Sequence, residues 1–423
     1  MKLPVDGNLQ VSVRTPMRVL VADTFEASGL NGLRAAGCEV LYEPELSGAA
    51  LADVIGSSAA EVLVVRSTPV TEAMLVSAAL SLVIRAGAGV NTIDVSAAAK
   101  RGIYVSNCPG KNSVAVAELA FGLLLALDRR IPDNVADLRA GRWNKKLYSQ
   151  ARGLYGCTLG LLGFGGIGQE VARRARAFGL EVVVWSPRFL RDGAAALLTV
   201  PRDVDVTVLA SPQEVAESSD ALSLHLALTP ETRNFVGPAI LGRLKPGALF
   251  VNTARAELVD EEALADVVRT RGVRVGVDVF RDEPAASTAD LSPSLMALPN
   301  VYGTHHIGAS TEQAQEAIAS EVVRIVRSYK EIGIAPNAVN LSARTPATHR
   351  LVVRHRDRPG VLAHIFEELR RRNLNVQETE NVIFAGAEAA VARINVDGKP
   401  DPELLRSIES GSQDILSVHV VKI

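Results

Sequence analysis

The chain has 423 residues, of which 48% are hydrophobic and 22% are charged, and its formal net charge is −2 with a sequence pI near 6.4. Single hydrophobic cores stop growing near ~250–300 residues, so this length predicts more than one domain. The near-neutral charge gives no global electrostatic support for binding nucleic acid or an anionic membrane, and neither partner is expected.

The cysteines and the apolar segments of the chain indicate in which cellular compartment the protein is expected. Cys38, Cys108 and Cys157 are too few and too widely spaced for a disulfide framework or a metal site, so no metal is expected. The first residues lack the apolar core of a signal peptide. The most apolar helical run, residues 114–127, is shorter than the roughly 20 residues of a membrane span. A cytoplasmic protein is therefore expected.

The first part of the chain alternates short apolar strands with helical stretches. The predicted strands are residues 18–22, 38–42, 62–65 and 82–85. Such alternation predicts parallel βαβ units, and hence a small α/β domain over about the first 110 residues. Asn112-Ser113 then begins a long apolar helix that is expected to extend to about Leu127. Its apolar character suggests a buried interface between subunits, and a homodimer or homotetramer is expected.

A second series of strands and helices predicts another α/β domain with its own parallel sheet. Its predicted strands are residues 158–162, 181–185, 206–209, 221–224, 248–251 and 273–277. Residues 281–300, rich in proline, serine and alanine, predict a loop, and a helix is expected over about 310–332.

The last part of the chain differs in pattern. Residues 333–348 contain two prolines and little periodicity, which predicts a linker. The β-α-β-β-α-β order that follows predicts a ferredoxin-like α+β domain. Its predicted strands are residues 351–353, 376–379, 389–394 and 415–421, and its predicted helices are residues 361–372 and 402–408. The fold class is therefore α/β, with two Rossmann-like or flavodoxin-like parallel-sheet domains and a C-terminal ferredoxin-like domain.

A glycine loop predicts a dinucleotide site. Gly163, Gly165 and Gly168 form G-x-G-x-x-G between the strand 158–162 and a predicted helix 169–178, which is the context of the dinucleotide fingerprint. Gly163 makes the tight turn, Gly165 lets the backbone approach a pyrophosphate, and Gly168 allows close helix–strand packing. Helix N-terminal amides would face the diphosphate. The expected contacts are Gly163, Phe164, Gly165, Gly166, Ile167 and Gly168, and the alternative is a bare βα turn.

The end of the next strand leaves the choice between NAD and NADP open. An acidic residue usually binds the ribose 2′-hydroxyl of NAD there, but Ser186 stands in its place. Arg188 and Arg191 follow, and a hydroxyl with two arginines could bind a 2′-phosphate, which favours NADP. The alternative is that both arginines are exposed and NAD binds without the carboxylate.

Three segments that follow strands of the second series complete the predicted site. They are Val251-Asn252-Thr253-Ala254-Arg255, Asp278 to Pro284, and Thr304-His305-His306-Ile307-Gly308. Further motifs are RAGAGVNTIDVSAAAKRGI from Arg85, LLGFGGIGQEVARRARAFG from Leu161, LTPETRNFVG from Leu228 and HIGAST from His306. With these motifs the chain resembles the D-isomer-specific 2-hydroxyacid dehydrogenases, and among them most closely the D-3-phosphoglycerate dehydrogenases, from about Arg18 to Ile423.

The resemblance implies roles for these residues. The catalytic residues would be Arg255, Glu283 and His306, and Thr253 and Asp278 would contact the cofactor. An arginine binds a carboxylate bidentately, a histidine can take the hydroxyl proton as hydride leaves, and a carboxylate orients the ring. His305 replaces the usual proline of the family and is expected to support His306. His225 is expected to be structural.

The resemblance also implies the division of the chain and the substrate contacts. The substrate-binding domain would comprise residues 1–111 and 307–334, and the dinucleotide domain residues 112–306. Substrate contacts are expected at Arg66, Ser67, Gly87, Ala88, Gly89, Asn112 and Gln315. Lys145 and Lys146, in a segment that crosses to the partner subunit in related enzymes, could bind a phosphate, or could form a solvated turn.

The segment His355-Arg356-Asp357-Arg358-Pro359-Gly360-Val361-Leu362 resembles the start of an ACT domain, which implies a regulatory domain at 349–423 after a linker at 335–348. Serine or another amino acid is the implied effector, with contacts at His355, Asp357 and Asn375. The family often has asparagine where Asp357 stands, which puts the effector in doubt. The alternative is a domain used only for oligomerisation.

The expected reaction is the NAD(P)-dependent oxidation of the small molecule 3-phospho-D-glycerate to 3-phosphohydroxypyruvate, the first step of serine synthesis. One alternative is another D-2-hydroxyacid dehydrogenase, such as a hydroxypyruvate or glyoxylate reductase. Another is a dinucleotide-sensing binding protein or corepressor.

Overall fold

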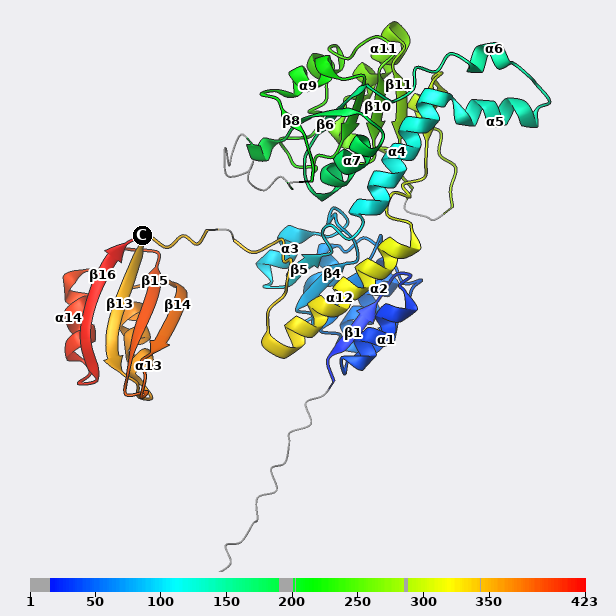
Figure 1. Cartoon of the computed structure of the whole chain (residues 1–423). Coiled ribbons are helices and arrows are strands. Elements are labelled where there is room, and N and C mark those ends of the chain that lie inside the picture. The colour runs from blue at the N-terminus through cyan, green and yellow to red at the C-terminus, as the bar shows by residue number, and fades with distance from the viewer. Residues whose placement is uncertain (1–15, 190–200, 202, 285–287, 343) are drawn as a thin grey trace, which may run out of the picture. The chain divides into compact units, whose positions relative to one another are not determined.

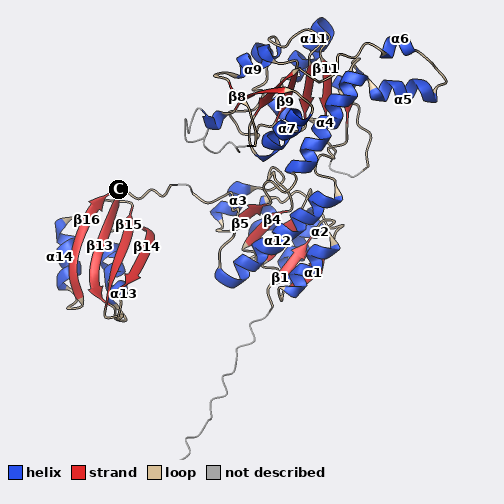
Figure 2. Ribbon diagram, viewed as in Figure 1, coloured by secondary structure: helices blue, strands red, loops and turns tan. Residues whose placement is uncertain are grey.

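The computed structural model describes residues 16–189, 201, 203–284, 288–342 and 344–423. The chain divides into two compact units, Met1–Asn340 and Leu341–Ile423 (Figure 1). The first unit contains two parallel sheets, and the second contains an antiparallel sheet (Figure 2).

The first sheet has the strand order β2-β1-β3-β4-β5, and all of its strands are parallel. The strands are β1 (Arg18–Val21), β2 (Glu39–Tyr42), β3 (Val62–Val65), β4 (Leu82–Arg85) and β5 (Tyr104–Asn107). Strand β3 reads VLVV and is buried along its whole length, as expected for a parallel sheet that is covered on both faces. The helical elements of this part are α1 (Ala27–Ala35), α2 (Gly48–Ser58), η1 (Glu72–Val76) and α3 (Val95–Lys100).

The chain returns to this sheet after the second one. Helix α12 (Glu312–Ile332) buries Ile318 and Val322 in one core with Val19 of β1 and Leu33 of α1. Beyond α12, Val339 N–H donates to the carbonyl of Val105 in the edge strand β5 at 2.8 Å. Part of the segment that was predicted as a linker therefore pairs with the edge of the first sheet.

The second sheet has the order β12-β11-β10-β9-β6-β7-β8, the doubly wound arrangement that was predicted from the βα series. Its strands are β6 (Thr158–Leu162), β7 (Glu181–Trp185), β8 (Thr207–Val208), β9 (Ala221–Leu224), β10 (Leu249–Asn252), β11 (Arg274–Val277) and β12 (Val301–Gly303). Its helical elements are α7 (Gly166–Ala177), α9 (Pro212–Ser218), α10 (Pro238–Leu241), η2 (Ala256–Leu258), α11 (Glu261–Arg271) and η3 (Ser294–Ala297).

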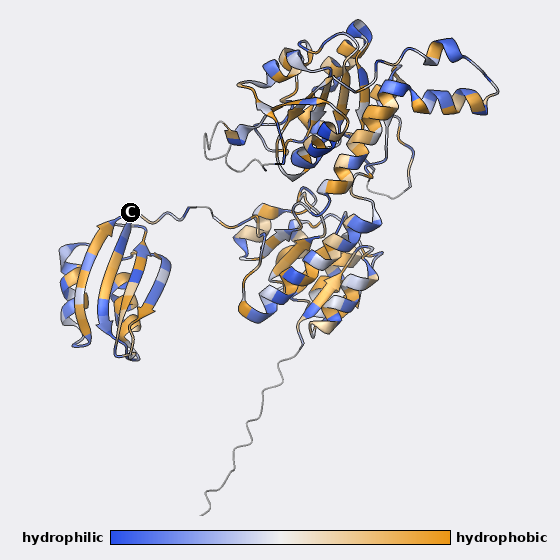
Figure 3. Cartoon of the chain, in the orientation of Figure 1, coloured by the Kyte–Doolittle hydropathy of each residue, from blue (hydrophilic) through white to orange (hydrophobic). Residues whose placement is uncertain are grey.

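The apolar helix α4 (Ser113–Arg129) is buried by its own chain. Leu124 and Leu127 lie in a core with Leu159 and Leu161 of β6, and the apolar colour runs along this helix in Figure 3. The apolar composition of α4 is therefore explained by packing within the chain, and the expected homodimer or homotetramer stays a prediction. Asn112 precedes the helix as expected, but its side chain forms no capping hydrogen bond. No helix in the described ranges is long and apolar enough to span a bilayer.

Two short helices after α4 have no buried residues. Helix α5 (Ile131–Arg139) and helix α6 (Lys145–Tyr148) extend away from the second sheet in Figure 1. We call residues 131–148, which contain both helices, the arm. The arm exposes several large apolar side chains: Ile131, Val135, Leu138, Trp143 and Leu147.

The C-terminal unit has the predicted β-α-β-β-α-β chain order and the strand order β14-β15-β13-β16. Its elements are β13 (His349–Arg356), α13 (Val361–Arg371), β14 (Val376–Ile383), β15 (Ala389–Val396), α14 (Pro402–Ser410) and β16 (Ile415–Lys422). Leu351, Ile394, Ile365 and Leu404 share one core, so both helices pack on the same face of the sheet.

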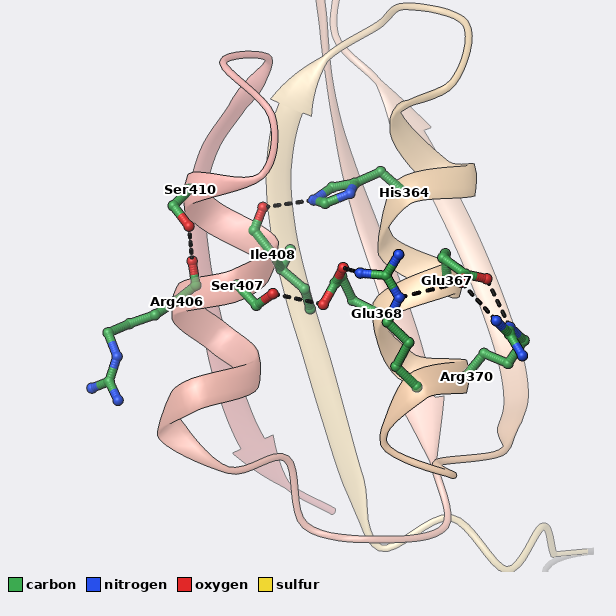
Figure 4. A network of polar contacts seen from close by, with 9 residues as sticks. His364, Glu367, Glu368, Arg370, Arg406, Ser407, Ile408 and Ser410 are labelled. Atoms are coloured by element: carbon green, nitrogen blue, oxygen red, sulfur yellow. Dashed lines mark hydrogen bonds and ion pairs between the residues drawn. The ribbon is translucent and has the colours of Figure 1, made fainter.

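Polar contacts join the two helices of this unit (Figure 4). The buried carboxylate of Glu368 on α13 accepts from the Ser407 hydroxyl of α14 at 2.6 Å and from Arg371 at 2.7 Å. His364 Nε2 lies 3.1 Å from the carbonyl of Ile408. These bonds satisfy polar groups that burial would otherwise leave unpaired.

Candidate active site

The glycine loop has the geometry that its sequence predicted. It follows β6, and helix α7 begins at Gly166, three residues earlier than expected, so the loop itself contributes to the first helical turn. Gly163 has φ of +99°, and a Cβ there would lie 2.3 Å from the His225 carbonyl oxygen. A Cβ on Gly168 would lie 2.5 Å from the Gly163 carbonyl oxygen, whereas one on Gly165 would meet nothing within 4 Å. Neighbouring backbone atoms therefore leave no room for a side chain at Gly163 and Gly168, whereas the space beside Gly165 is open, as the approach of a pyrophosphate requires.

Buried polar atoms near this loop fit a dinucleotide. Trp185 Nε1, His225 Nδ1 and Thr253 Oγ1 are buried and have no hydrogen-bond partner among the described residues. They lie at or just beyond the carboxyl ends of β7, β9 and β10, and β7 and β9 are the two neighbours of β6 in the sheet. Buried polar atoms are normally paired, so these atoms are candidates for ligand contacts. Phe164 is fully buried and Ile167 packs against the same core, which leaves their backbone groups as candidates for cofactor contacts.

His225 itself is held as a neutral residue. Its Nε2 lies 2.9 Å from the Ser223 hydroxyl, and burial lowers the pKa of His225 to about 3. A neutral, buried imidazole in a strand-end position supports the structural role that was expected for it.

The adenosine end of the predicted cofactor site carries a cation and no acidic residue at the usual position. Ser186 is buried directly after β7. The Arg188 guanidinium carbon lies 5.8 Å from the ring centroid of Phe164 and 5.2 Å from that of Phe189. Its Nε and Nη2 atoms have no partner among the described residues. Arg191, predicted beside it, lies outside the described residues.

His306 and Glu283 form a direct pair. His306 Nδ1 lies 2.6 Å from Glu283 Oε2, and Glu283 Oε1 accepts from the backbone N–H of Phe280 at 2.8 Å. Burial alone would raise the pKa of Glu283, but the bonds from His306 and Phe280 outweigh it and the pKa is lowered. An ionised carboxylate only accepts hydrogen bonds, so Nδ1 carries a proton and Nε2 is free to act as a base.

The loop that carries His306 is held by Asp278. The buried Asp278 carboxylate accepts from the Thr304 hydroxyl at 2.6 Å, from Ile307 N–H at 2.9 Å and from Gly308 N–H at 2.9 Å. His306 has φ of +52°, a conformation that residues with a side chain rarely adopt. Asp278 thus supports the loop, and its expected contact with the cofactor stays a prediction. His305 is exposed and its side chain forms no hydrogen bond to a described residue.

Arg255 meets the predicted substrate loop. A Cβ on Gly89 would lie 2.3 Å from Arg255 Nη2, so the guanidinium lies directly beside that glycine. Asn252 fixes the turn before it, since its side chain donates to the Arg255 carbonyl at 2.9 Å and accepts from Ala254 N–H at 3.0 Å. The structure therefore brings Arg255 together with Gly89.

Arg85, which was not among the predicted contacts, lies in the same place. It ends β4, whose neighbour β3 is followed by Arg66. Burial, together with the nearby charges of Arg255 and Arg66, lowers the pKa of Arg85 to about 10. Arg66, Arg85 and Arg255 are here called the arginine cluster, and the charges of Arg66 and Arg255 both act on Arg85. A charged residue at the carboxyl end of an otherwise apolar, buried strand was the signal that could have identified Arg85.

The other predicted substrate contacts lie around this cluster. The carbonyl of Gly87 accepts from Cys108 N–H at 2.9 Å, and that of Ala88 accepts from the Asn107 side chain at 2.5 Å. Asn112 Oδ1 is buried and has no partner among the described residues. Gln315 donates to the Ala309 carbonyl at 2.7 Å. Lys145 and Lys146 are exposed on the arm.

The three predicted effector contacts are not brought together within one chain. His355 is buried, with Nδ1 2.8 Å from the Arg356 carbonyl and Nε2 3.1 Å from Asn381 Oδ1. Asp357 follows directly at the end of β13. Asn375 directly precedes β14. The first residue of β14, Val376, pairs with Val396 of β15, and Val396 also pairs with His349, the first residue of β13. Asn375 therefore lies at the opposite end of the sheet from His355 and Asp357.

Comparisons with known proteins match this fold and site. A family model described as D-isomer specific 2-hydroxyacid dehydrogenase, NAD binding domain, matches residues 121–308. The D-3-phosphoglycerate dehydrogenase of Methanocaldococcus jannaschii is 37% identical over 328 residues, which are 77% of this chain and 60% of that protein. The hydroxypyruvate reductase of Thermotoga maritima is 41% identical over 278 residues, 65% of this chain and 85% of that protein. The solved structure of NAD+-bound 3-phosphoglycerate dehydrogenase from Entamoeba histolytica has a TM-score of 0.63 and 26% identity, and the match covers 77% of this chain and 99% of that one.

Fold and site together define an oxidoreductase with a dinucleotide-binding domain. The chain belongs to the D-isomer specific 2-hydroxyacid dehydrogenase family. The predicted class, an oxidoreductase that acts on CH-OH with NAD or NADP, is confirmed at the level of the family. The chain spans about half to 60% of the length of the phosphoglycerate dehydrogenases of Mycobacterium leprae and Methanocaldococcus jannaschii that it matches.

Proposed function

We propose that this chain oxidises 3-phospho-D-glycerate to 3-phosphohydroxypyruvate with NAD or NADP. The observation that carries the proposal is the arginine cluster of Arg66, Arg85 and Arg255. One guanidinium suffices to bind one carboxylate bidentately. Three guanidinium groups at one site are best explained by a ligand with more negative charge, and 3-phospho-D-glycerate carries a phosphate as well as a carboxylate.

The roles of the site residues follow from their contacts. Arg255 would bind the substrate carboxylate and orient C2, and a bound nicotinamide ring would supply the hydride acceptor. His306 would take the hydroxyl proton at Nε2, because its Nδ1 faces Glu283 at 2.6 Å. Glu283 would stabilise the imidazolium that forms. Arg66 and Arg85 would then face the phosphate end of the substrate.

Two rival functions remain as alternatives. A hydroxypyruvate or glyoxylate reductase fits the family, and the Thermotoga relative is named as a hydroxypyruvate reductase. The substrates of such a reductase carry one carboxylate and no phosphate, so their single negative charge would not balance the three positive charges of the arginine cluster. A dinucleotide-sensing protein or corepressor would have no need of a His306–Glu283 pair at 2.6 Å.

The proposal is tested by a matrix of substrates and cofactors. The full chain is assayed with 3-phospho-D-glycerate, hydroxypyruvate and glyoxylate, each with the NAD and the NADP couple. We expect the highest kcat/KM for the phosphorylated substrate and its keto product. Good turnover of glyoxylate without turnover of the phosphorylated pair would contradict the proposal, and binding of dinucleotide without any turnover would favour the sensor.

We further propose that the C-terminal unit is an ACT domain that binds serine or another amino acid. Its strand order supports this assignment. His355 and Asp357 lie at one end of the sheet and Asn375 at the other, so a site that uses all of them requires two copies of the unit. The exposed apolar side chains of the arm support a homodimer or homotetramer, in which Lys145 and Lys146 could reach the partner's substrate. Three buried free thiols, Cys38, Cys108 and Cys157, support a cytoplasmic location.

The division of the chain also stays a proposal. We assign residues 1–111 and 307–334 to the substrate-binding domain, 112–306 to the dinucleotide domain, 335–348 to the linker and 349–423 to the regulatory domain. The shared core of α12 and the first sheet supports the discontinuous assignment.

A further inference from the structure

Asp23 accepts hydrogen bonds from a whole turn of the predicted substrate site. Asp23 follows β1, and residues 66–68, here called the Arg66 turn, follow the parallel neighbour β3. Asp23 Oδ2 accepts from the backbone N–H groups of Arg66, Ser67 and Thr68 at 2.6, 3.1 and 3.1 Å. Its Oδ1 accepts from the Ser67 hydroxyl at 3.3 Å. Consecutive N–H groups that converge on one oxygen form a nest, a backbone arrangement that binds anions.

Because Asp23 fills this nest, the backbone donors of the Arg66 turn are already used within the chain. The group of this turn that can still bind a substrate anion is then the guanidinium of Arg66. Its charge contributes to lowering the pKa of Arg85. Asp23 is itself close enough to favour the charged form of Arg85. Its carboxylate therefore affects the arginine cluster both through the geometry of the turn and through its charge.

We propose that Asp23 is a positioning residue for substrate binding: it fixes the Arg66 turn so that the Arg66 side chain faces the phosphate end of the substrate. The inference rests on the proposed function, because it takes the arginine cluster as the substrate site. Asp23 acts through the turn and does not touch the substrate.

The charge of Asp23 and its geometry predict effects of opposite sign. Removal of a carboxylate near Arg66 and Arg85 leaves a more positive site, which by Coulomb attraction alone would tighten the binding of an anion. Replacement of the charged acceptor by the weaker amide oxygen of asparagine, beside an NH2 donor that faces the same N–H groups, would instead loosen the turn and misplace Arg66, which weakens binding. The sign of the change in KM therefore separates positioning from simple electrostatics.

The experiment compares the full-length wild type with Asp23→Asn and with the control Asp94→Asn. Asp94 caps α3 in the same unit by accepting from Ala97 N–H at 2.9 Å, so the control removes a similar local bond elsewhere. For Asp23→Asn we expect KM for 3-phospho-D-glycerate to rise on the order of tenfold, the effect of losing charge-assisted hydrogen bonds. The kcat and the dissociation constant of the dinucleotide should change far less, and Asp94→Asn should keep the wild-type KM.

An unchanged or lowered KM in Asp23→Asn would overturn the inference. If that variant does not fold, Asp23→Glu keeps the charge but moves the carboxylate by one methylene, and a wild-type KM in this variant would also overturn it. The measurement uses the best substrate of the wild type. Failure of the wild type to oxidise 3-phospho-D-glycerate would contradict the proposed function. The KM comparison with the best substrate would still test whether Asp23 positions Arg66.

Discussion

Carboxylates that follow the strands accept hydrogen bonds from several groups of the candidate site, and they thereby determine which atoms remain available to bind a ligand. Glu283 accepts a hydrogen bond from Nδ1 of His306, and Asp278 accepts hydrogen bonds from the N–H groups of Ile307 and Gly308. Asp23 accepts hydrogen bonds from those of the Arg66 turn. In each case the carboxylate orients a neighbouring group, and what remains for a ligand is the Nε2 atom of His306 and the guanidinium groups.

Replacement of His306 by asparagine tests the assignment of the base. His306→Asn should lower kcat by about 10²–10⁴-fold, the usual contribution of a general base, while the dinucleotide still binds. Steady-state rates and calorimetric titration with the dinucleotide measure the two effects. The neighbouring His305→Asn serves as the comparison, since His305 is exposed. Loss of activity in His305→Asn with an active His306→Asn would show that the two histidines had been assigned in the wrong order.

Replacement of Ser186 by aspartate tests the choice of cofactor. A carboxylate at this position can accept from the ribose 2′-hydroxyl of NAD and would repel the 2′-phosphate of NADP. The ratio of the NADP to the NAD dissociation constant should therefore rise by at least about tenfold in Ser186→Asp. Direct titration with both dinucleotides measures this ratio. An unchanged ratio would mean that Ser186 does not face the adenosine ribose.

At the scale of secondary-structure elements, the site is formed where parallel strands end. The first sheet places Asp23 after β1, Arg66 after β3 and Arg85 at the end of β4, and these strands are neighbours. The second sheet places the glycine loop after β6. Ligand sites of open α/β sheets lie at such carboxyl ends, because the loops there converge on one edge.

The same elements show how far the sequence alone could predict the structure. The glycine loop is a local pattern, so its tight turn at Gly163 was predictable. Strand β5 reads YVSN, and its polar residues break the apolar run, so it was missed. Arg85 and Asp23 were missed for a different reason: their roles depend on the order β1-β3-β4 in the sheet, and chain order does not reveal which strands are neighbours.

Helix α12 carries a buried carboxylate that gives a pH-dependent prediction. Glu321 accepts from Arg324 at 2.6 Å and from Asn337 at 2.7 Å, and it pairs with Lys111 at 3.3 Å. The bond from Arg324 contributes most to lowering the pKa of Glu321, to about 2, although burial opposes it. Asn337 also donates to the carbonyl of Asn107, so this carboxylate links α12, the segment after it and the end of β5.

Glu321→Gln should lower the free energy of unfolding at neutral pH by about 1–3 kcal/mol, as expected when charge-assisted bonds are lost. A lowered pKa means that the folded state prefers the ionised form. The stabilisation is therefore complete above the ordinary glutamate range near pH 4.5 and is lost as the pH falls toward about 2. Denaturant unfolding at pH 7 and pH 3 should show a smaller difference between wild type and variant at pH 3. An equal difference at both values, or an equal loss in the exposed control Glu331→Gln, would contradict this account.

At the scale of the whole molecule, the chain combines a catalytic unit with a second unit that has its own core. Leu351, Ile365 and Ile394 form that core without residues from the first unit. The proposed role of this second unit is to bind an amino acid that regulates the first unit. In that proposal the negative charge of Asp357 bears directly on which amino acid could bind.

Titration of serine against the initial rate tests this regulation. If the unit binds serine through Asp357, the wild type should be inhibited, and Asp357→Asn should shift the inhibition to lower serine concentration, because an amide donor replaces a negative charge near the effector carboxylate. Sedimentation of both proteins checks that the oligomeric state is the same. Flat curves for both would leave the unit with a role in oligomerisation alone.

In the proposed function, the arginine cluster of Arg66, Arg85 and Arg255 selects a phosphorylated 2-hydroxy acid. The most direct test is the ratio of kcat/KM for 3-phospho-D-glycerate to that for D-glycerate, two substrates that differ only in the phosphate. Loss of a phosphate contacted by charged donors should lower kcat/KM by on the order of a hundredfold in the wild type, and far less in Arg85→Leu. A wild-type ratio near one, or below it, would contradict the account.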